Sequence, residues 1–352
     1  MSQPRIGINA HLLSAAAGYR RAGIHRYSAE LINHLPAGPD EPAYTVFTNA
    51  PAELAGRPGI QTVAAPWPTA GPLGRILWEQ LVWPPVAVAG RLDLLHSLSF
   101  ATPLLRPCPA VATVYDLSFV LYPELYPPLQ RWYLRSQTRR SCRSARRVVA
   151  ISEAGRRDVA RLFGVAPARI DVVPPGVDAH FGPRPAAEVE AFRQRQGLPA
   201  EVILHVGTLQ PRKNLALLAE AVAQLGRPDV ALVFVGGKGW HYEPLFERVR
   251  ALGLEGQARF TGYVADSDLA LWYNAASVLA LPSVYEGFGL PLIQAMACGT
   301  PLVAANSSSL PEVVGPAGLL FDPQDSQALA RCLAAVLDEP ELAAALRAAG
   351  LE

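Results

Sequence analysis

Short runs of apolar residues alternate along the whole chain with longer segments of helical periodicity. The short runs are apolar throughout, which is typical of parallel strands that are covered on both faces. The first half predicts strands at 5–10, 44–48, 60–64, 92–95, 110–115 and 147–151 and helices at 24–35, 128–145 and 153–163. The second half predicts strands at 202–206, 231–235, 258–260, 278–281 and 302–304 and helices that include 186–196, 269–276 and 341–349.

Residue types mark several of the predicted helix ends. Ser152 stands where a side-chain oxygen can cap the helix that follows it, and Gly164 stands where that helix must stop. Asn214 is expected to cap the helix that begins after the strand at 202–206.

The repeated strand–helix order predicts two doubly wound parallel sheets, an α/β fold. A break falls at Val172-Val173-Pro174-Pro175-Gly176-Val177-Asp178, where a strand ends in a rigid turn. A polar helix and then a new strand follow this turn. We therefore expect two Rossmann-like domains, residues 1–178 and residues 179–352, that face each other across a cleft.

The composition excludes several classes of protein. Half of the residues are hydrophobic and 17% are charged, so a packed protein is expected and a disordered one is not. The 31 basic and 30 acidic side chains give a net charge of +1, so no overall field attracts nucleic acid. The four cysteines match no zinc pattern and suit a reducing, cytoplasmic setting. Without a leader or an apolar run of roughly 18 residues, we expect a soluble or peripheral protein.

Two adjacent cations, Arg212 and Lys213, lie in the loop Gly207-Thr208-Leu209-Gln210-Pro211-Arg212-Lys213-Asn214. The start of a helix offers free N–H groups and a partial positive charge, which suits a phosphate, and Lys213 adds a full charge. Such a pair is also common as solvated surface, and this loop alone leaves both interpretations open.

The strand at 278–281 leads into a second loop, Pro282-Ser283-Val284-Tyr285-Glu286-Gly287-Phe288-Gly289. Gly287 and Gly289 allow a ligand to approach the backbone. The N–H groups there can hold a diphosphate at the carboxyl end of a parallel sheet, where α/β proteins bind ligands. Glu286, at the entrance of the loop, can meet the hydroxyls of a sugar.

From Glu286 onward the sequence resembles the signature of family 4 of the retaining GT-B glycosyltransferases, in which a glutamate, seven residues and a second glutamate frame the donor. Further matching segments occur in the family's order and cover residues 5 to about 323. They are Gly23-Ile24-His25-Arg26-Tyr27, Asp116-Leu117, Ile151-Ser152, Pro174-Pro175-Gly176-Val177-Asp178, Pro211-Arg212-Lys213-Asn214, Gly262-Tyr263-Val264 and Leu310-Pro311-Glu312-Val313.

The resemblance implies the GT-B architecture and a nucleotide diphosphate sugar as co-substrate, bound without a metal or another cofactor. Lys213 and Arg212 would neutralise the departing diphosphate, and Glu286 would contact the transferred sugar. Gly23 would let the donor phosphate approach the N-terminal, acceptor-side domain. The remaining donor-binding positions, which would act mainly through the backbone, are Tyr263, Val264, Gly287, Phe288, Gly289 and Leu290.

One Asp-x-Asp pair, Asp266-Ser267-Asp268, has the spacing that a metal-dependent transferase uses at its donor site. It stands just ahead of the predicted helix at 269–276, where capping that helix is the favoured role. We therefore expect no metal.

Two positions depart from the family pattern. Gln294 stands where the family has the second glutamate, which accepts hydrogen bonds from the ribose hydroxyls, so the interaction here loses its charge. Tyr115 stands where many relatives have a histidine close to the reacting sugar, and tyrosine does not ionise near neutral pH. Asp116 is then either the acidic group nearest the acceptor or the cap of a following turn. The chain also stops at Leu351-Glu352, where family members usually have a helix that crosses back to the N-terminal domain.

We therefore expect a hexosyltransferase of polysaccharide biosynthesis, with Tyr115, Asp116, Lys213 and Glu286 as catalytic residues and a glycan, lipid-linked or small-molecule acceptor. Likeness to mannosyl- and rhamnosyltransferases favours GDP-mannose, with UDP- and dTDP-sugars open. The alternative is a non-catalytic homologue that binds nucleotide sugars or glycans, which Gln294 and Tyr115 support. A nicotinamide-dependent oxidoreductase is excluded because no G-x-G-x-x-G follows the first strand.

Arginines crowd one predicted helix together with Trp132. They can hold the protein at the anionic inner face of a membrane, where lipid-linked acceptors lie, or they can form a solvated helix surface. The arginines of this Arg131–Arg147 region are Arg131, Arg135, Arg139, Arg140, Arg143, Arg146 and Arg147.

Overall fold

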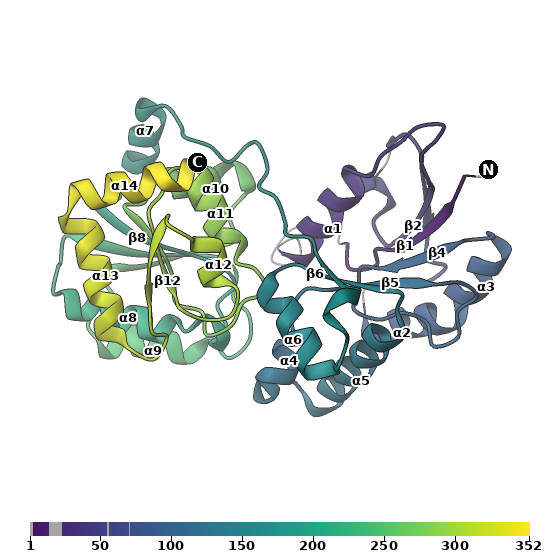
Figure 1. Cartoon of the computed structure of the whole chain (residues 1–352). Coiled ribbons are helices and arrows are strands. Elements are labelled where there is room, and N and C mark those ends of the chain that lie inside the picture. The colour runs from purple at the N-terminus through teal and green to yellow at the C-terminus, as the bar shows by residue number, and fades with distance from the viewer. Residues whose placement is uncertain (1–2, 14–22, 55, 70) are drawn as a thin grey trace. The chain divides into compact units, whose positions relative to one another are not determined.

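The computed structural model describes residues 3–13, 23–54, 56–69 and 71–352. The chain forms two compact units, unit 1 (Met1–Pro175) and unit 2 (Gly176–Glu352), which can be followed by colour in Figure 1. The sequence pattern predicts the domain boundary three residues later, at residue 178. No helix in the described ranges has the length and apolar character needed to cross a membrane.

The described part of unit 1 contains a seven-stranded sheet in the order β3-β2-β1-β4-β5-β6-β7, with every neighbouring pair parallel. Its strands are β1 (Arg5–Asn9), β2 (Ala43–Thr48), β3 (Ile60–Ala64), β4 (Leu94–Ser97), β5 (Ala110–Val114), β6 (Arg147–Ala150) and β7 (Ile170–Val172). Its helices are α1 (Ile24–Asn33), α2 (Pro72–Leu77), α3 (Trp83–Ala89), α4 (Ser118–Leu121), α5 (Pro128–Ser144) and α6 (Glu153–Phe163). Shorter helical turns are η2 (Pro51–Leu54), η3 (Trp78–Val82), η4 (Pro123–Leu125) and η5 (Pro167–Arg169).

The helices of unit 1 divide between the two faces of its sheet. Connections between parallel strands are right-handed, so a connection that moves the opposite way across the sheet places its helix on the opposite face. The step from β1 to β2 puts α1 on one face, and the later steps put α2, α3, α5 and α6 on the other (Figure 1). The direction reverses between β1 and β4, which are neighbours in the sheet.

The described part of unit 2 contains a six-stranded parallel sheet in the order β10-β9-β8-β11-β12-β13. Its strands are β8 (Glu201–Val206), β9 (Val230–Val235), β10 (Ala258–Gly262), β11 (Val278–Leu281), β12 (Leu302–Ala305) and β13 (Gly318–Phe321). Its helices are α7 (Ala186–Gln196), η6 (Pro211–Lys213), α8 (Leu215–Leu225), α9 (Glu243–Ala251), α10 (Asp266–Ala275), α11 (Leu290–Ala297), α12 (Leu310–Val314), α13 (Ser326–Asp338) and α14 (Pro340–Leu351).

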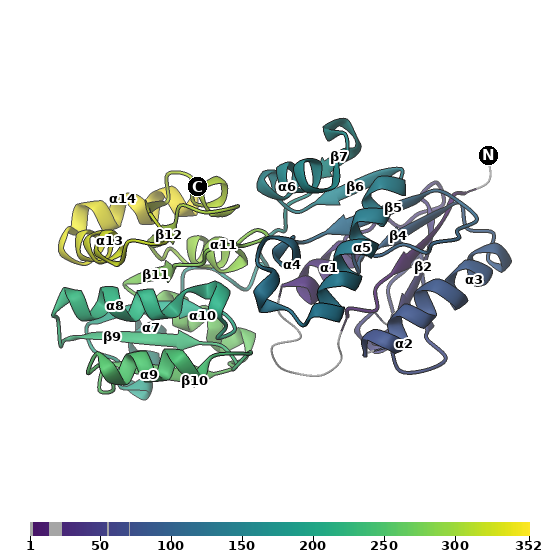
Figure 2. The same ribbon diagram turned by 90° about the horizontal axis from the view of Figure 1, so that it is seen from below.

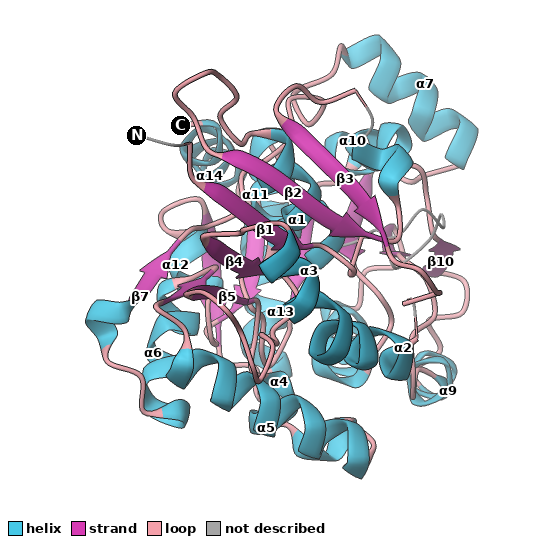
Figure 3. Ribbon diagram, turned by 90° about the vertical axis from the view of Figure 1, so that its right-hand side faces the viewer, coloured by secondary structure: helices cyan, strands magenta, loops and turns pink. Residues whose placement is uncertain are grey.

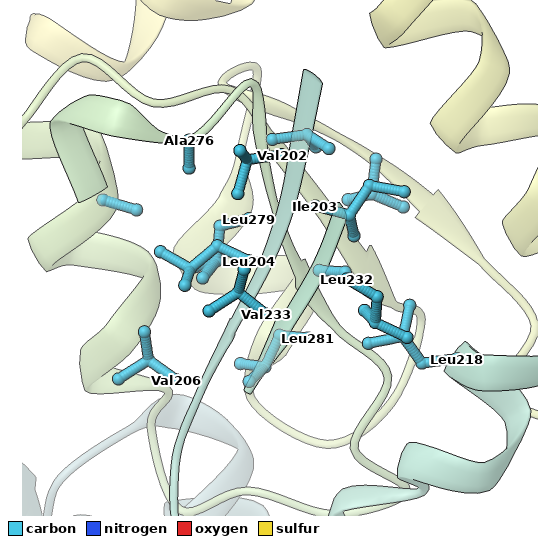
Figure 4. Close-up of a cluster of buried hydrophobic side chains, with 14 of the residues drawn as sticks. Val202, Ile203, Leu204, Val206, Leu218, Leu232, Val233, Ala276, Leu279 and Leu281 are labelled. Carbon is cyan, nitrogen blue, oxygen red and sulfur yellow. The ribbon is translucent and has the colours of Figure 1, made fainter. Parts of the chain in front are cut away.

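The core of unit 2 lies on both faces of this sheet. Val202 and Leu204 of β8 point to one side, near Ala276 at the end of α10 (Figure 4). Ile203 points to the other side, the side on which Leu218 of α8 lies (Figure 4). All five side chains are buried, which explains why these strands read as apolar throughout.

The fold class predicted from the sequence is confirmed, since both sheets are parallel and both reverse direction once. Most predicted strands and helices lie within two residues of the observed ones. The caps of α6 are also as predicted. The Ser152 hydroxyl accepts a hydrogen bond from the N–H of Gly155 at 2.9 Å, and Gly164 ends the helix in the left-handed conformation.

Two elements escape the sequence pattern. Residues 72–89 form the consecutive helical turns α2, η3 and α3, although Pro84 and Pro85 suggest a loop. Both prolines lie in the first turn of α3, where a missing N–H is tolerated. The short strand β13 begins with Gly318 and is only partly buried, so its apolar run is brief.

Two predicted helix caps are wrong. Asn214 is left-handed and makes no side-chain cap for α8, because its Nδ2 instead donates to the carbonyl of Pro323 at 2.8 Å. Asp266 and Asp268 do not precede α10 but lie in its first turn, after Ala265. Carboxylates in that turn stabilise the helix through its dipole.

Candidate functional site

The carboxyl ends of β8 and β11 meet at the point where the strand order of unit 2 reverses. The chain leaves β8 toward β9 on one side, whereas β11 pairs with β8 on the other side. Parallel α/β sheets bind ligands at such a point, outside the carboxyl ends of the strands. The loop 207–214 after β8 and the loop 282–289 after β11 are joined there by a backbone hydrogen bond, from Val284 N–H to Arg212 C=O at 3.0 Å.

Glu286 lies between two cations at this point. Its Oε1 accepts hydrogen bonds from Lys213 Nζ at 2.5 Å and from the Ser283 hydroxyl at 2.7 Å. Its Oε2 accepts one from the guanidinium of Arg212 at 2.9 Å, and Arg212 also donates to the carbonyl of Tyr285. Glu286 and Lys213 are both only 8% exposed. The sequence-predicted charges therefore form one buried cluster, which we call the Glu286 cluster (Arg212, Lys213, Ser283 and Glu286).

Burial alone would raise the pKa of Glu286, but the positive charges of Arg212 and Lys213 hold that pKa well below its usual range. The carboxylate is therefore ionised at any physiological pH. With two cations and one carboxylate, the cluster keeps a net charge of +1. It can hold an anion without a metal ion.

His205, on β8, lies under the Glu286 cluster. Its Nδ1 bonds the carbonyl of Ala280 at 3.0 Å, and its Nε2 is buried without a partner in the described part of the chain. Burial, with a smaller contribution from the charge of Lys213, lowers the pKa of His205 to about 4. A neutral imidazole thus adds no charge beneath the cluster. Sequence reasoning missed this residue because it stands inside an apolar strand.

Serine hydroxyls hold the loop around Glu286 in place. The backbone N–H of Glu286 donates to the Ser308 hydroxyl at 2.8 Å. The Ser309 hydroxyl donates to the carbonyls of Glu286 at 2.9 Å and of Phe288 at 3.0 Å. Sequence reasoning missed these residues as well, and the run of three serines after β12 was the available signal.

Four consecutive amides follow Glu286 at the start of α11. Within the described residues, the backbone N–H groups of Gly287, Phe288, Gly289 and Leu290 have no hydrogen-bond partner. Gly289 has φ +104°, and a Cβ there would lie 3.0 Å from Leu310, so glycine is required. Free amides beside a positive cluster can hold phosphate and sugar oxygens.

Gln294 lies one turn further along α11. Its Oε1 accepts a hydrogen bond from the hydroxyl of Tyr273 at 2.9 Å, and both side chains are buried. The amide is therefore held in a fixed orientation.

Tyr263 and Val264 follow β10, on the far side of β9 from the Glu286 cluster. The side chain of Tyr263 is 48% exposed, and that of Val264 is partly buried. Backbone hydrogen bonds tie the ends of these strands together, from Gly236 N–H to Gly262 C=O at 2.9 Å and from Gly207 N–H to Val235 C=O at 2.8 Å. Tyr263 thus lies along the same carboxyl edge of the sheet as the cluster.

The other predicted residues belong to unit 1. Gly23 is the N-cap of α1 with φ +47°. The hydroxyl of Tyr115 is buried, donates to the carbonyl of Leu98 at 3.0 Å and lies 2.9 Å from the Ser28 hydroxyl. Burial raises the pKa of Tyr115 further above its usual range.

Asp116 has the geometry of a turn cap. Its Oδ1 accepts hydrogen bonds from the N–H of Ser118 at 2.9 Å and from the Ser118 hydroxyl at 2.6 Å. The catalytic roles of Tyr115 and Asp116 remain predictions.

Two family profiles match the chain. That of the glycosyl transferases group 1 matches residues 188–352, and that of glycosyltransferase family 4 matches residues 21–181. This chain is a family 4 GT-B protein. The Glu286 cluster and the amides of α11 lie in the group 1 part of this family 4 protein.

The family 4 chain is similar to known glycosyltransferases. It is 38% identical over 224 residues to O-antigen chain mannosyltransferase B of Escherichia coli. The matched segment covers 62% of this chain and 59% of the relative. It is 39% identical over 220 residues to D-inositol 3-phosphate glycosyltransferase of Kineococcus radiotolerans. Here the matched segment covers 56% of this chain and 50% of the relative. The chain thus spans between half and three fifths of these relatives' length.

A solved structure confirms the GT-B fold of the family 4 chain. Sucrose-phosphate synthase from Thermosynechococcus elongatus superimposes with a TM-score of 0.78 at 25% identity, over 99% of this chain and 93% of that one.

Proposed function

We propose that this chain is a retaining hexosyltransferase that binds a nucleotide diphosphate sugar in unit 2 and needs no metal ion. The observation that carries the proposal is the Glu286 cluster beside the unpartnered amides of 287–290. When the bond between sugar and diphosphate breaks, the diphosphate gains a negative charge. Cations and amides that are already in place stabilise that charge as it develops.

The donor lies along the carboxyl edge of the sheet in this proposal. The base lies against the backbone at Tyr263 and Val264, and the sugar lies at Glu286. Three strand spacings separate the ends of β10 and β11, about 14 Å, which an extended nucleotide sugar can bridge. Gln294 accepts a hydrogen bond from the ribose, and Glu286 accepts one from a sugar hydroxyl.

The acceptor lies on the side of unit 1. The bond from the anomeric carbon to the diphosphate oxygen breaks, and a bond to the acceptor oxygen forms on the same face of the sugar. The acceptor proton passes to the departing phosphate oxygen. Gly23 leaves room for the phosphate, Asp116 orients the acceptor, and Tyr115 positions Asp116 through its own buried hydroxyl.

The donor sugar is a hexose, with mannose favoured by the similarity to the Escherichia coli O-antigen mannosyltransferase. GDP-mannose is thus the first donor to test, ahead of UDP- and dTDP-sugars. The acceptor is a glycan, a lipid-linked sugar or a small molecule of polysaccharide biosynthesis. The protein acts in the cytoplasm, with contact to the inner face of the membrane through the Arg131–Arg147 region.

The test is thermal denaturation with GDP, UDP, ADP and dTDP, each with and without EDTA. A ligand at about one hundred times its dissociation constant stabilises the folded state by about 2.7 kcal/mol, or roughly 5–10 °C for a unit of this size. We expect one nucleotide to stabilise the protein equally with and without EDTA. The matching nucleotide sugar should then be turned over, with the anomeric configuration retained in the product.

Lys213→Met should abolish this stabilisation, because the cluster loses its ammonium group. The matched control is Arg248→Met, which removes a cation from an ion pair with Glu220 elsewhere in unit 2. Stabilisation by a nucleotide without turnover would favour the non-catalytic homologue. Stabilisation by no nucleotide, or by one only when a metal is present, would contradict the proposed donor site.

A further inference from the structure

One face of unit 1 combines exposed apolar side chains with arginines. It is formed by residues 72–89 (α2, η3 and α3), residues 98–109 and residues 128–147 (α5 and the start of β6), and we call it the α2–α5 face. Figure 2 shows α2, α3 and α5 on the same side of the sheet. Hydrogen bonds join the three segments, from Leu104 N–H to Gln80 Oε1 and from Thr102 N–H to the Ser141 hydroxyl, each at 2.9 Å.

Large apolar side chains are exposed along this face. Leu73, Leu77 and Leu81 are spaced four residues apart, so they form one stripe along α2 and η3. Trp132 is 66% exposed and lies three residues from Leu129 on α5. The full set on this face is Leu73, Leu77, Leu81, Val88, Leu104, Leu105, Leu129 and Trp132. Several exposed apolar side chains on adjoining elements indicate an interaction surface, whereas single exposed leucines do not.

Nearly all charged side chains of this face are positive. Its three segments contain nine arginines and a single carboxylate, Glu79, although the whole chain is almost neutral. Glu79 is buried and accepts hydrogen bonds from Asn9 and Ser99, so it offers no negative charge at the surface. Arg135 and Arg139 continue the exposed side of α5 beyond Trp132 and have no ion pair with any described residue.

The end of the face toward β5 and β6 is hollowed. A cavity of about 550 Å³ is lined by Arg106, Arg143, Arg146, Arg147 and Arg169, and Asp171 pairs with Arg147 alone. Burial lowers the pKa of Arg106, the charge of Cys108 partly offsets this, and the charge of Arg140 adds a smaller lowering. Five arginines around one hollow suit anionic oxygens.

We propose that the α2–α5 face docks on an anionic membrane surface, with its leucines and Trp132 in the interface and its arginines on lipid phosphates. Exposed apolar side chains beside a large excess of arginines, with no exposed carboxylate in the three segments, are what such a surface attracts. The proposal deepens the proposed function, because a docked unit 1 meets a lipid-linked acceptor. Vesicle binding itself depends on neither donor nor acceptor.

The test is flotation of the full chain with phosphatidylcholine vesicles, with and without phosphatidylglycerol, at low and high salt. We expect binding to the anionic vesicles only and weakening by salt, since surface charges are screened. Leu77→Ser with Leu81→Ser and Trp132→Ser should weaken binding about ten-fold or more, because several apolar groups leave the interface. Arg135→Glu with Arg139→Glu should weaken it at least as much, since each arginine contributes about five-fold.

The control variant, Arg347→Glu with Leu351→Ser, changes an exposed arginine and an exposed leucine of unit 2 and should bind as the unaltered protein does. All variants should keep the unaltered melting temperature and the same nucleotide stabilisation, which separates this test from that of the donor site. Equal binding to neutral vesicles, or full binding by both face variants, would overturn the proposal. So would a dimer, seen by light scattering, that the leucine variant loses while vesicles stay unbound.

Discussion

Glu286 is a buried carboxylate whose two basic partners are also expected to be the donor's partners. In the unliganded protein it bonds both Lys213 and Arg212, so a diphosphate has to share these cations with it. In the proposed donor complex its negative charge would oppose phosphate binding slightly, while its oxygens would orient the sugar. Binding and turnover should respond in opposite directions when this charge is removed.

The change Glu286→Gln keeps the shape of the side chain and removes the charge. We expect nucleoside diphosphate to bind as tightly as before or more tightly, whereas kcat falls about 100-fold because an interaction made in the transition state is lost. The free energy of unfolding should fall by about 3 kcal/mol, since two buried cations lose their counterion. Calorimetric binding and turnover assays measure the two effects separately. A parallel loss of affinity would contradict the role assigned to Glu286.

The acid response of the same variant follows from the pKa of Glu286. That pKa is lowered in the folded state, so its stabilising contribution is complete above the ordinary value of 4.5 and is lost as the pH falls below it. Glu286→Gln should therefore lose less stability than the unaltered protein between about pH 5 and pH 3. Ser283→Ala, which keeps every charge, should retain the unaltered slope in urea denaturation.

Gln294 can be tested by restoring the family's carboxylate. Gln294→Glu should strengthen nucleoside diphosphate binding about five- to ten-fold, because a charged acceptor bonds the ribose more strongly than an amide does. The gain should vanish with 2′-deoxynucleoside diphosphates, which lack one of the hydroxyls. Titration calorimetry with both ligands decides this. An unchanged affinity together with lower stability would show that Gln294 only packs against Tyr273.

At the residue scale, the charged members of the site could be predicted and its supports could not. Arg212, Lys213 and Glu286 stand in loops after apolar strands, where the family pattern is strong. Ser309 is marked only by the run of three serines, and His205 by nothing. A hydroxyl that bonds two carbonyls and an imidazole inside a strand are defined by contacts distant in sequence.

At the scale of elements, the loops after β8, β9 and β10 act as one assembly. Gly236 brings the end of β9 against the backbone of Gly207, so close that a Cβ at residue 236 would lie 2.0 Å from the carbonyl oxygen of Gly207. The loop that carries Arg212 and Lys213 starts at Gly207. The position of the cations therefore depends on a backbone contact between two strands.

Gly236→Ala should lower the free energy of unfolding of unit 2 by about 3 kcal/mol or more, because backbone has to move to admit the methyl group. It should also reduce nucleoside diphosphate affinity, since the loop 207–214 shifts with it. Urea denaturation with and without ligand measures both. The matched control is Gly253→Ala, which has a positive φ but open space around it, and should cost about 1–2 kcal/mol without changing affinity. Similar results for both variants would contradict the argument.

The elements show where a sequence pattern succeeds and where it fails. Buried parallel strands such as β8 and β9 are apolar throughout and can be predicted almost to the residue. The turns at 72–89 cannot, because Pro84 and Pro85 indicate a loop unless the preceding helical turns are already known. Figure 3 shows these turns as helices beside the strands of unit 1. The apolar stripe of Leu73, Leu77 and Leu81 can be recognised only once these residues are known to be helical.

At the scale of the whole molecule, the two units should respond to acid independently. His96 in unit 1 and His205 in unit 2 are buried, and burial lowers the pKa of each from 6.5 to about 4. In the unfolded chain each histidine binds a proton once the pH falls below 6.5. In the folded chain it does so only when the pH falls to about 4. Each histidine therefore makes its unit less stable as the pH falls from 6.5 toward 4, by up to about 1.4 kcal/mol per pH unit.

His96→Gln should flatten the pH dependence of unit 1 by about that slope and leave unit 2 unchanged, and His205→Gln should do the reverse. Glu79, whose pKa burial raises, contributes the opposite trend to unit 1, but it does so equally in the variant and the unaltered protein. Hydrogen exchange of peptides from β5 and β6, compared with those from β8 and β9, gives the opening free energy of each unit. If either substitution changed both profiles equally, the two units would unfold as one cooperative structure.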